Sequence, residues 1–536
     1  MRQGDQVSDV GRFEFILVLV VAIVVLALVA RLLRLPTSAA LIVGGIALAL
    51  IPGMPDVDLD PELVLVAFLP PLLLSGAYFT VWPAFRVNLG PILQLAVGTV
   101  LFTTLVVGVA AHWLMPSMPW AACFALGAIV APPDAVAAKS VLERVHLPEK
   151  LSVMLEGESL LNDATSLVLY RFAVAAVLTG SFSLLHATLA FGVLAVGGVV
   201  LGGACGWIVL HILRRIRDPM LVISLTLLTP WIVYITGERA GVSGVMATVT
   251  AGLMIGWHQH EIFGADVRLR ATAVWSVLTF MLESLIFILI GLSLRGVLHP
   301  RQGVAGSLPH LAWPVAGVVL ATIVARFAWM YGATLLEWLL APDTTRPAPA
   351  EAVGRATVLG WAGMRGVVSL AVALSVPATV PGRDFILLAT FAVILVTVLG
   401  QGATIGLVIR WTGVARQTGP HAAHLTEPQA RARLADAQRQ TVERLAHAPD
   451  GTVLHPRLLE QYRYRARVAA RFSNEVDTLR QDRDAHYAVL LATIEAGRAE
   501  LLRLHRGGMI HDHVLRRLEN ELDLQQLAAE GARGND

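Results

Sequence analysis

The chain has 536 residues, of which 56% are hydrophobic and 15% are charged, and its formal net charge at pH 7 is +2. With a mean hydropathy of +0.67, this composition lies outside the range of soluble proteins and predicts a polytopic membrane protein. The net charge gives no indication of a nucleic-acid partner, because in a membrane protein the loop positions of Lys and Arg carry the information. The two cysteines, Cys123 and Cys205, lie in apolar segments and fit neither a disulfide framework nor a metal-binding spacing.

Thirteen apolar segments follow a polar start of about twelve residues. Most of them are long enough for an α-helix, which rises 1.5 Å per residue, to cross about 30 Å of hydrocarbon. The segments are predicted at about 13–33, 37–52, 61–79, 90–114, 119–138, 151–177, 185–213, 219–236, 241–257, 272–294, 311–338, 355–377 and 384–409. We therefore expect an all-α polytopic membrane protein with about thirteen transmembrane helices.

The loops between these segments carry an uneven share of the positive charges. If the N-terminus lies outside, the inner loops hold thirteen Lys and Arg, namely Arg31, Arg34, Arg86, Lys139, Arg144, Lys150, Arg214, Arg215, Arg217, Arg268, Arg270, Arg346 and Arg355. The outer loops hold four, namely Arg239, Arg295, Arg301 and Arg383. Because positive residues accumulate on the cytoplasmic side, the pattern predicts an external N-terminus and a cytoplasmic C-terminus.

The segment at about 151–177 carries acidic and polar side chains where an apolar surface is expected. Counted from its start, Glu158 lies roughly 10 Å deep and Asp163 roughly 17 Å deep, which is near the bilayer midplane. Ser159 and Asn162 share an arc of about 140° with them, at about 100° per residue. A charge at this depth costs at least about 2.5–3.5 kcal/mol, and such residues generally mark functional sites. A structural cluster that holds helices together is the alternative.

Two other segments are interrupted near their middle. Residues 131–135 read Ala-Pro-Pro-Asp-Ala, and the two prolines remove amide donors and clash with the preceding turn. Residues 360–369 contain three glycines and Arg365, and they occupy the corresponding place seven segments later. A disrupted helix in each half is typical of inverted-repeat transporters, in which the site lies where two broken helices cross. We therefore expect the freed carbonyls and the Asp134 carboxylate to face Asp163.

Further charges lie inside the predicted spans. Arg365 needs a negative partner in this apolar environment, and Glu158 is the first candidate, with Glu283 second. We expect that pair to be structural. The other charges within the spans are Arg171, Glu238, Glu283 and Arg326. Each is expected to face the protein interior, with solvent contact at the outer helix ends as the alternative for Arg171 and Glu238.

The composition changes at about residue 412, and the last 125 or so residues are rich in Arg, Glu, Asp, Gln and Ala. Apolar residues recur there at helical spacing, which predicts a soluble, helical, cytoplasmic tail. Two interpretations stay open: a helical hairpin that packs on itself or on a second copy, and a regulatory domain. Several histidines of the tail are candidates for pH sensing, including His421, His424, His447, His455, His486, His511 and His513.

The stretch from Gly157 to Ala164, the interrupted segment with Asp134, Glu283, and the Met-Arg-Gly sequence around Arg365 resemble the cation:proton antiporter-1 family, which contains bacterial sodium/proton antiporters and animal sodium/proton exchangers. The resemblance covers about residues 13–411 and leaves 412–536 as a separate tail. It implies a thirteen-helix homodimer of the bacterial inner membrane, with a dimerisation domain and a mobile core domain. It also implies electroneutral exchange of one Na⁺ for one H⁺, because relatives with Asp-Asp in place of Asn-Asp are usually electrogenic.

The resemblance also implies roles for individual residues. Asp163 would bind a cation and a proton alternately, and Ser159 and Asp134 would be further ligands of the transported Na⁺. Asn162 would hold the broken helices in place, while the predicted pair of Glu158 with the arginine of the second break would be structural.

Two positions depart from the pattern of this family. Ser75, which follows Pro70-Pro71, stands where several relatives carry a glutamate, so one ligand of the cation is in question. Pro133 replaces a residue that contributes an oxygen in some relatives, and its backbone carbonyl is the remaining donor.

A transport mechanism needs only that a proton and a metal cation compete for the Asp163 carboxylate, because hard oxygen ligands suit a dehydrated cation. If the protein changes its access only when this carboxylate is neutralised, the two ions must take turns. Exchange of K⁺ for H⁺ uses the same motifs and stays open, and a cation channel or a membrane sensor that signals through the tail is the alternative class. The sequence lacks a nucleotide-binding loop and the paired histidines or nucleophile motif of an intramembrane enzyme, so no cofactor and no enzymatic activity are expected.

Overall fold

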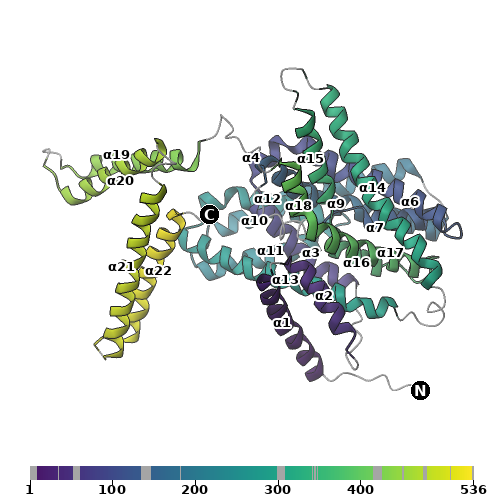
Figure 1. The fold of residues 1–536 in the computed structure, drawn as a ribbon, viewed down its shortest axis with the longest axis horizontal. Helices are drawn as coiled ribbons and strands as arrows, with labels where there is room; N and C mark the ends of the chain where they lie inside the picture. The colour runs from purple at the N-terminus through teal and green to yellow at the C-terminus, as the bar shows by residue number, and fades with distance from the viewer. Residues whose placement is uncertain are drawn as a thin grey trace. The chain divides into compact units, whose positions relative to one another are not determined.

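The computed structural model describes residues 9–33, 35–51, 61–134, 147–180, 183–298, 308–340, 342, 346, 348–414, 425–448, 452–474, 480–507 and 509–533. Within these ranges the chain forms helices and their connections, and the only β-type pairing is one isolated bridge. The chain divides into two compact units, Met1–Thr418 and Gly419–Asp536. Figure 1 shows the helices of both units along the chain.

Each of the thirteen apolar segments predicted from the sequence overlaps at least one described helix of the first unit. Its described elements are α1 (Asp9–Leu32), α2 (Thr37–Ala49), α3 (Pro61–Phe79), α4 (Trp82–Val87), α5 (Leu89–Leu93), η1 (Gln94–Thr99), α6 (Val100–Leu114), α7 (Trp120–Val130), α9 (Glu149–Thr179), α10 (Leu184–Leu213), α11 (Pro219–Arg239), α12 (Gly244–Ile262), α13 (Ala265–Leu298), α14 (Leu308–Leu340), α15 (Pro349–Trp361), α16 (Val367–Leu374), α17 (Arg383–Leu395), η2 (Val396–Gln401) and α18 (Gly402–Thr412). The elements η1 and η2 are single π-helical stretches inside longer helices.

Eight helical stretches of the described residues are long and apolar enough to cross a membrane, and three shorter apolar helices accompany them. The protein is therefore a multi-pass membrane protein. The total of thirteen spans stays a prediction. Residues 135–138, at the end of the segment predicted at 119–138, lie outside the described residues.

The helices of the first unit pack in two groups. In one group α9 packs mainly on α7 and on the α5–η1 stretch, and α6, α14, α15, α16, α17 and α18 complete it. In the other, α2 packs on α13 and α12 packs on α3, α10 and α11, with α1 at its edge. Packing between the groups is lighter and runs mainly from α16 to α3 and from α9 to α12. The first group contains both interrupted helices and the predicted Asn-Asp motif.

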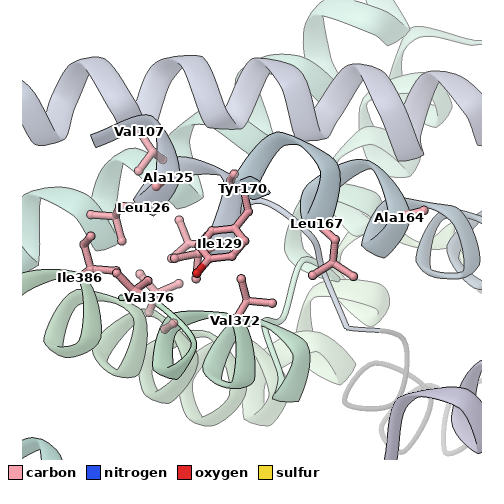
Figure 2. Packing of buried hydrophobic residues seen from close by; sticks show 14 of the residues in the cluster. Val107, Ala125, Leu126, Ile129, Ala164, Leu167, Tyr170, Val372, Val376 and Ile386 are labelled. Atoms are coloured by element: carbon pink, nitrogen blue, oxygen red, sulfur yellow. The ribbon is translucent and has the colours of Figure 1, made fainter. Parts of the chain in front are cut away.

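The largest hydrophobic core lies inside the first group. Figure 2 shows Leu126 and Ile129 of α7 packed with Leu167 and Tyr170 of α9 and with residues of α16 and α17. Ile129 is fully buried, and the other three are at least nine-tenths buried. This core fixes α9 against the ends of both interrupted helices.

The second unit consists of two helical hairpins. Helix α19 (Glu427–Leu445) packs on α20 (Pro456–Asn474), and α21 (Arg480–Arg506) packs on α22 (Asp512–Arg533). Helix α19 begins at a Thr-Glu-Pro sequence in which the Thr426 amide donates to the Gln429 side chain at 3.0 Å, a capping interaction that satisfies an otherwise free donor. The domain boundaries predicted at 411 and 412 stay a prediction, although the last helix of the first unit ends at Thr412.

Candidate functional site

Two interrupted helices meet at their breaks. Helix α7 ends at Val130, one residue before the two prolines, and residues 131–134 that follow are not helical. In the other half, α15 ends at Trp361 and α16 begins only at Val367. The backbone amide of Asp134 donates to the carbonyl of Met364 at 2.7 Å, so the two breaks are joined directly. The predicted contact between the two breaks is therefore present, while the part of the first segment after residue 134 lies outside the described residues.

Side chains from neighbouring helices bind the backbone carbonyls that the first break sets free. The Asn162 Nδ2 atom donates to the carbonyl of Pro133 at 2.7 Å, and the Ser166 hydroxyl donates to that of Ala128 at 2.8 Å. The Arg365 Nε atom donates to the carbonyl of Val130 at 3.0 Å. A cation at the C-terminal end of a helix also interacts favourably with the helix dipole. The Asn162 side chain therefore contacts the first break directly, and the role that the resemblance implies for it stays a proposal.

The second break depends on a glycine. A Cβ atom at Gly366 would overlap the Asp134 carboxylate, so this carboxylate lies directly against the backbone that leads into α16. On the other side of the break, the Arg365 amide donates to the Thr397 hydroxyl of η2 at 3.1 Å. The glycine-rich sequence thus allows the two broken segments to approach closely.

The Asp163 carboxylate lies beside this crossing, on α9. It is 8% exposed, while the neighbouring Asn162 is fully buried. Asp163 and Asp134 are close enough for their charges to repel each other. Ser159 lies one helical turn before Asp163 on the same helix and is half-buried. The structure therefore brings together the four residues that the sequence predicted as a cation and proton site, and their roles stay a proposal.

The buried ion pair differs from the prediction. Glu158 accepts hydrogen bonds from both terminal nitrogens of Arg326, at 2.7 and 3.0 Å, and both side chains are 1% exposed. Arg326 also donates from Nε to the carbonyl of Leu359 at 3.1 Å. Glu158 therefore pairs with Arg326, and not with Arg365 as predicted. The reason is that Arg365 lies on the break and uses its guanidinium for the backbone carbonyls of Val130 and Gly363.

The other predicted charges lie elsewhere. Arg171 and Glu238 form an ion pair of 2.9 Å, with 52% and 32% of their side chains exposed, so they contact the surroundings rather than a buried site. Glu283 is half-buried on α13, which belongs to the second packing group. Ser75 is half-buried on α3, and the adjacent Gly76 lies against Leu160 of α9. Ser75 is therefore next in sequence to a residue that packs against α9, the helix that carries Asp163.

A multi-pass helical unit with two interrupted helices crossing beside a buried carboxylate has the architecture of a secondary ion transporter. The model of the family described as "sodium/hydrogen exchanger, transmembrane" matches residues 17–411. The chain belongs to this family.

The similar proteins are named as exchangers or antiporters. An uncharacterized Na⁺/H⁺ exchanger of Mycobacterium tuberculosis is 34% identical in an alignment of 532 residues that covers 96% of this chain and 95% of that protein. The Na⁺/H⁺ antiporter ApNhaP of Aphanothece halophytica is 32% identical over 77% of each chain. A sodium, potassium, lithium and rubidium/H⁺ antiporter of Bacillus pumilus is 32% identical over 66% of this chain and 55% of that protein.

The fold is similar to that of a solved antiporter. Two structures of the sodium proton antiporter MjNhaP1 from Methanocaldococcus jannaschii match this chain with TM-scores of 0.57 and 0.60, at 19% and 21% identity. They cover 75% and 77% of this chain and 98% and 99% of the solved chain.

Proposed function

We propose that this protein is a secondary active antiporter that exchanges a monovalent cation, first of all Na⁺, for H⁺ across the bacterial inner membrane. The observation that carries the proposal is the position of Asp163, a nearly buried carboxylate beside the crossing of two broken helices. Carboxylate, hydroxyl and carbonyl oxygens are the ligands that hard cations prefer. Asp163, Asp134 and Ser159 supply such oxygens for the transported ion.

The charges at the crossing support one-for-one exchange. Among the described residues there, Arg326 and Arg365 carry two positive charges, while Glu158, Asp134 and Asp163 carry three negative charges when ionised. One bound monovalent cation or one bound proton brings this group to neutrality. Moving net charge through a medium of low dielectric constant is costly. The site therefore switches its opening from one side of the membrane to the other only in these two neutral states. Exchange is then electroneutral, and neither a nucleotide nor a cofactor takes part.

Asn162 and the Glu158–Arg326 pair have different structural roles in this mechanism. Asn162 keeps the Pro133 carbonyl in place and so fixes the first break against α9. The Glu158–Arg326 pair joins α9 to α14 and keeps both charges neutralised in the protein interior. We also propose that the protein works as a homodimer, as the family resemblance implies. The loop charges support an external N-terminus and a cytoplasmic tail.

Potassium is the second candidate for the transported cation. The relative from Bacillus pumilus is named as a sodium, potassium, lithium and rubidium/H⁺ antiporter. Selectivity between these ions depends on the size of the site and the field strength of its ligands. The sequence motifs of this chain are compatible with both Na⁺/H⁺ exchange and K⁺/H⁺ exchange.

The test is proton movement in proteoliposomes that contain the purified full chain. Vesicles with an acidic interior receive Na⁺, Li⁺, K⁺ or choline outside, and internal pH is recorded with and without a clamp of the membrane potential. We expect cation-dependent alkalinisation that is unaffected by the clamp and strongest with Na⁺. A response that is strongest with K⁺ would assign the second candidate. A response that depends on the clamp would contradict electroneutral exchange, and conductance far above carrier turnover would indicate a channel.

A further inference from the structure

The turn that joins α19 and α20 exposes large apolar side chains. Leu445 ends α19 and is 73% exposed, and Val453 and Leu454, which lead into α20, are 45% and 57% exposed. Leu458, in the first turn of α20, is 42% exposed. We call these four residues the apolar tip. Contiguous exposed apolar residues generally mark a surface that binds a partner or a membrane.

The apolar tip is held in a defined shape. The Leu454 amide donates to the carbonyl of Ala446 at 2.7 Å, and the Ala448 amide donates to that of Thr452 at 2.9 Å. These bonds accompany an antiparallel bridge between His447 and Val453. The residue after Leu445 and the residue after Leu458, Ala446 and Leu459, are 1% and 6% exposed. The hairpin therefore buries Ala446 and Leu459, and leaves the preceding residues Leu445 and Leu458 exposed.

Two arginines flank the apolar tip. Arg444 and Arg457 are exposed on either side of it. The nearby acid Glu443 is already paired with Arg439 at 2.5 Å and with Arg463 at 3.0 Å. The tip thus combines exposed apolar groups with two flanking arginines, while Glu460, two residues after Leu458, is an exposed acid beside it.

The two hairpins of the tail differ in charge. Residues 427–474, which form the first hairpin, contain nine arginines and five acidic residues, whereas residues 480–533 contain eight arginines and nine acidic residues. Only the first hairpin therefore matches an anionic surface. The second, which is also a hairpin of two helices with exposed leucines, provides an internal control.

We propose that the apolar tip inserts into the headgroup region of the anionic membrane in which the protein resides, with Arg444 and Arg457 contacting lipid phosphates. Arginine binds phosphate strongly through its planar donors, and basic amphipathic segments bind anionic bilayers through combined charge and apolar burial. The chain length permits it, because fourteen residues separate Thr412 at the end of α18 from Glu427. Such a linker reaches up to about 50 Å, and α19 is about 28 Å long.

The experiment uses the full chain in lipid nanodiscs. Natural cysteines Cys123 and Cys205 are replaced by serine, a single cysteine replaces Leu454, and an environment-sensitive NBD fluorophore is attached to it. We expect a blue-shifted, quencher-protected signal in discs with phosphatidylglycerol but not in discs of phosphatidylcholine alone. The matched control carries the fluorophore in place of Leu527, which is 60% exposed on α22, and its signal should not depend on the lipid.

Two measurements of amide exchange decide whether lipid or a second copy of the chain covers the apolar tip. The double change Arg444→Gln/Arg457→Gln should weaken the lipid-dependent protection of residues 442–460 against amide exchange by roughly fivefold or more, as expected for arginines at an anionic surface. The control Arg516→Gln/Arg517→Gln on α22 should have no effect. Equal signals in both kinds of disc would overturn the proposal. Protection that appears in lipid-free detergent and rises with protein concentration would also overturn it, because a second copy would then cover the tip.

Discussion

Arginine–carboxylate pairs occur both beside the helix crossing of the membrane unit and on the helices of the tail, but in opposite environments. The Glu158–Arg326 pair is 1% exposed on both sides, whereas Arg503 and Glu500 of α21 are 63% and 54% exposed. Breaking a buried pair leaves an uncompensated charge and costs about 3–5 kcal/mol, while an exposed pair contributes about 0–1 kcal/mol. The pair in the membrane unit therefore determines which helices adjoin, and the tail depends on its apolar helix faces.

The largest effect on stability is expected when one member of the buried pair is removed. Glu158→Ala leaves Arg326 buried without its carboxylate and should destabilise the membrane unit by about 3–5 kcal/mol, with a large drop in the melting temperature and the yield of purified protein. Glu443→Ala, in the tail, is the matched control and should leave both unchanged. The double change Glu158→Leu/Arg326→Met should recover part of the loss, because no charge is then left alone. Equal melting temperatures for Glu158→Ala and the natural chain would contradict the role of the pair.

A smaller loss is expected for the residue that binds the first break. Asn162→Ala removes the hydrogen bond to the Pro133 carbonyl and leaves this acceptor buried, which should cost about 1–3 kcal/mol. Exchange should fall as well, because the break is no longer held against α9. Thermal unfolding and proteoliposome exchange of the same preparation check both expectations. Asn162→Ala with natural stability and natural exchange would show that the crossing does not need this bond.

The smallest effect is expected in the tail and depends on pH. His505 contacts Asp512 at 2.6 Å across the turn between α21 and α22, and the hydrogen bond from His505 holds the pKa of Asp512 below its ordinary value. A lowered pKa means that the stabilising contribution is present above the ordinary value of about 4 and is lost as pH falls through the lowered value. The rate of amide exchange near residues 509–515, taken relative to that of the unfolded chain at the same pH, should therefore rise below about pH 4. In Asp512→Asn the contact should already be weakened at neutral pH, and a rise of the same size in that variant would contradict the assignment.

Much of the fold follows from the sequence because membrane insertion makes long apolar runs unambiguous. The effect of prolines is less predictable: Pro70 and Pro71 lie inside the continuous helix α3, whereas Pro132 and Pro133 follow the end of α7. Both pairs remove amide donors, and the difference depends on which neighbours bind the freed carbonyls. At the second pair Asn162 provides such a neighbour, which only the folded chain reveals.

The site was predictable as a set of residues but not as a set of pairs. The helical period placed Asp163 and Asn162 on one face of a helix. The two breaks indicated that this face lies where the interrupted helices meet. The choice between Arg326 and Arg365 as the partner of Glu158 depends on how α14 packs against α9, which is a contact between distant segments. Arg326 was recognisable as an intramembrane charge, and no local pattern ranks it above Arg365.

The central claim is that a proton and a cation compete for the Asp163 carboxylate, and proton release on cation binding tests it most directly. NaCl or choline chloride is added to the purified full chain in weakly buffered detergent solution, and released protons are measured with a pH indicator for the natural chain, Asp163→Asn and the control Asp266→Asn on α13. We expect the natural chain and Asp266→Asn to release up to one proton per chain with Na⁺, and Asp163→Asn, still folded, to release none. Undiminished Na⁺-dependent release from folded Asp163→Asn would contradict the account.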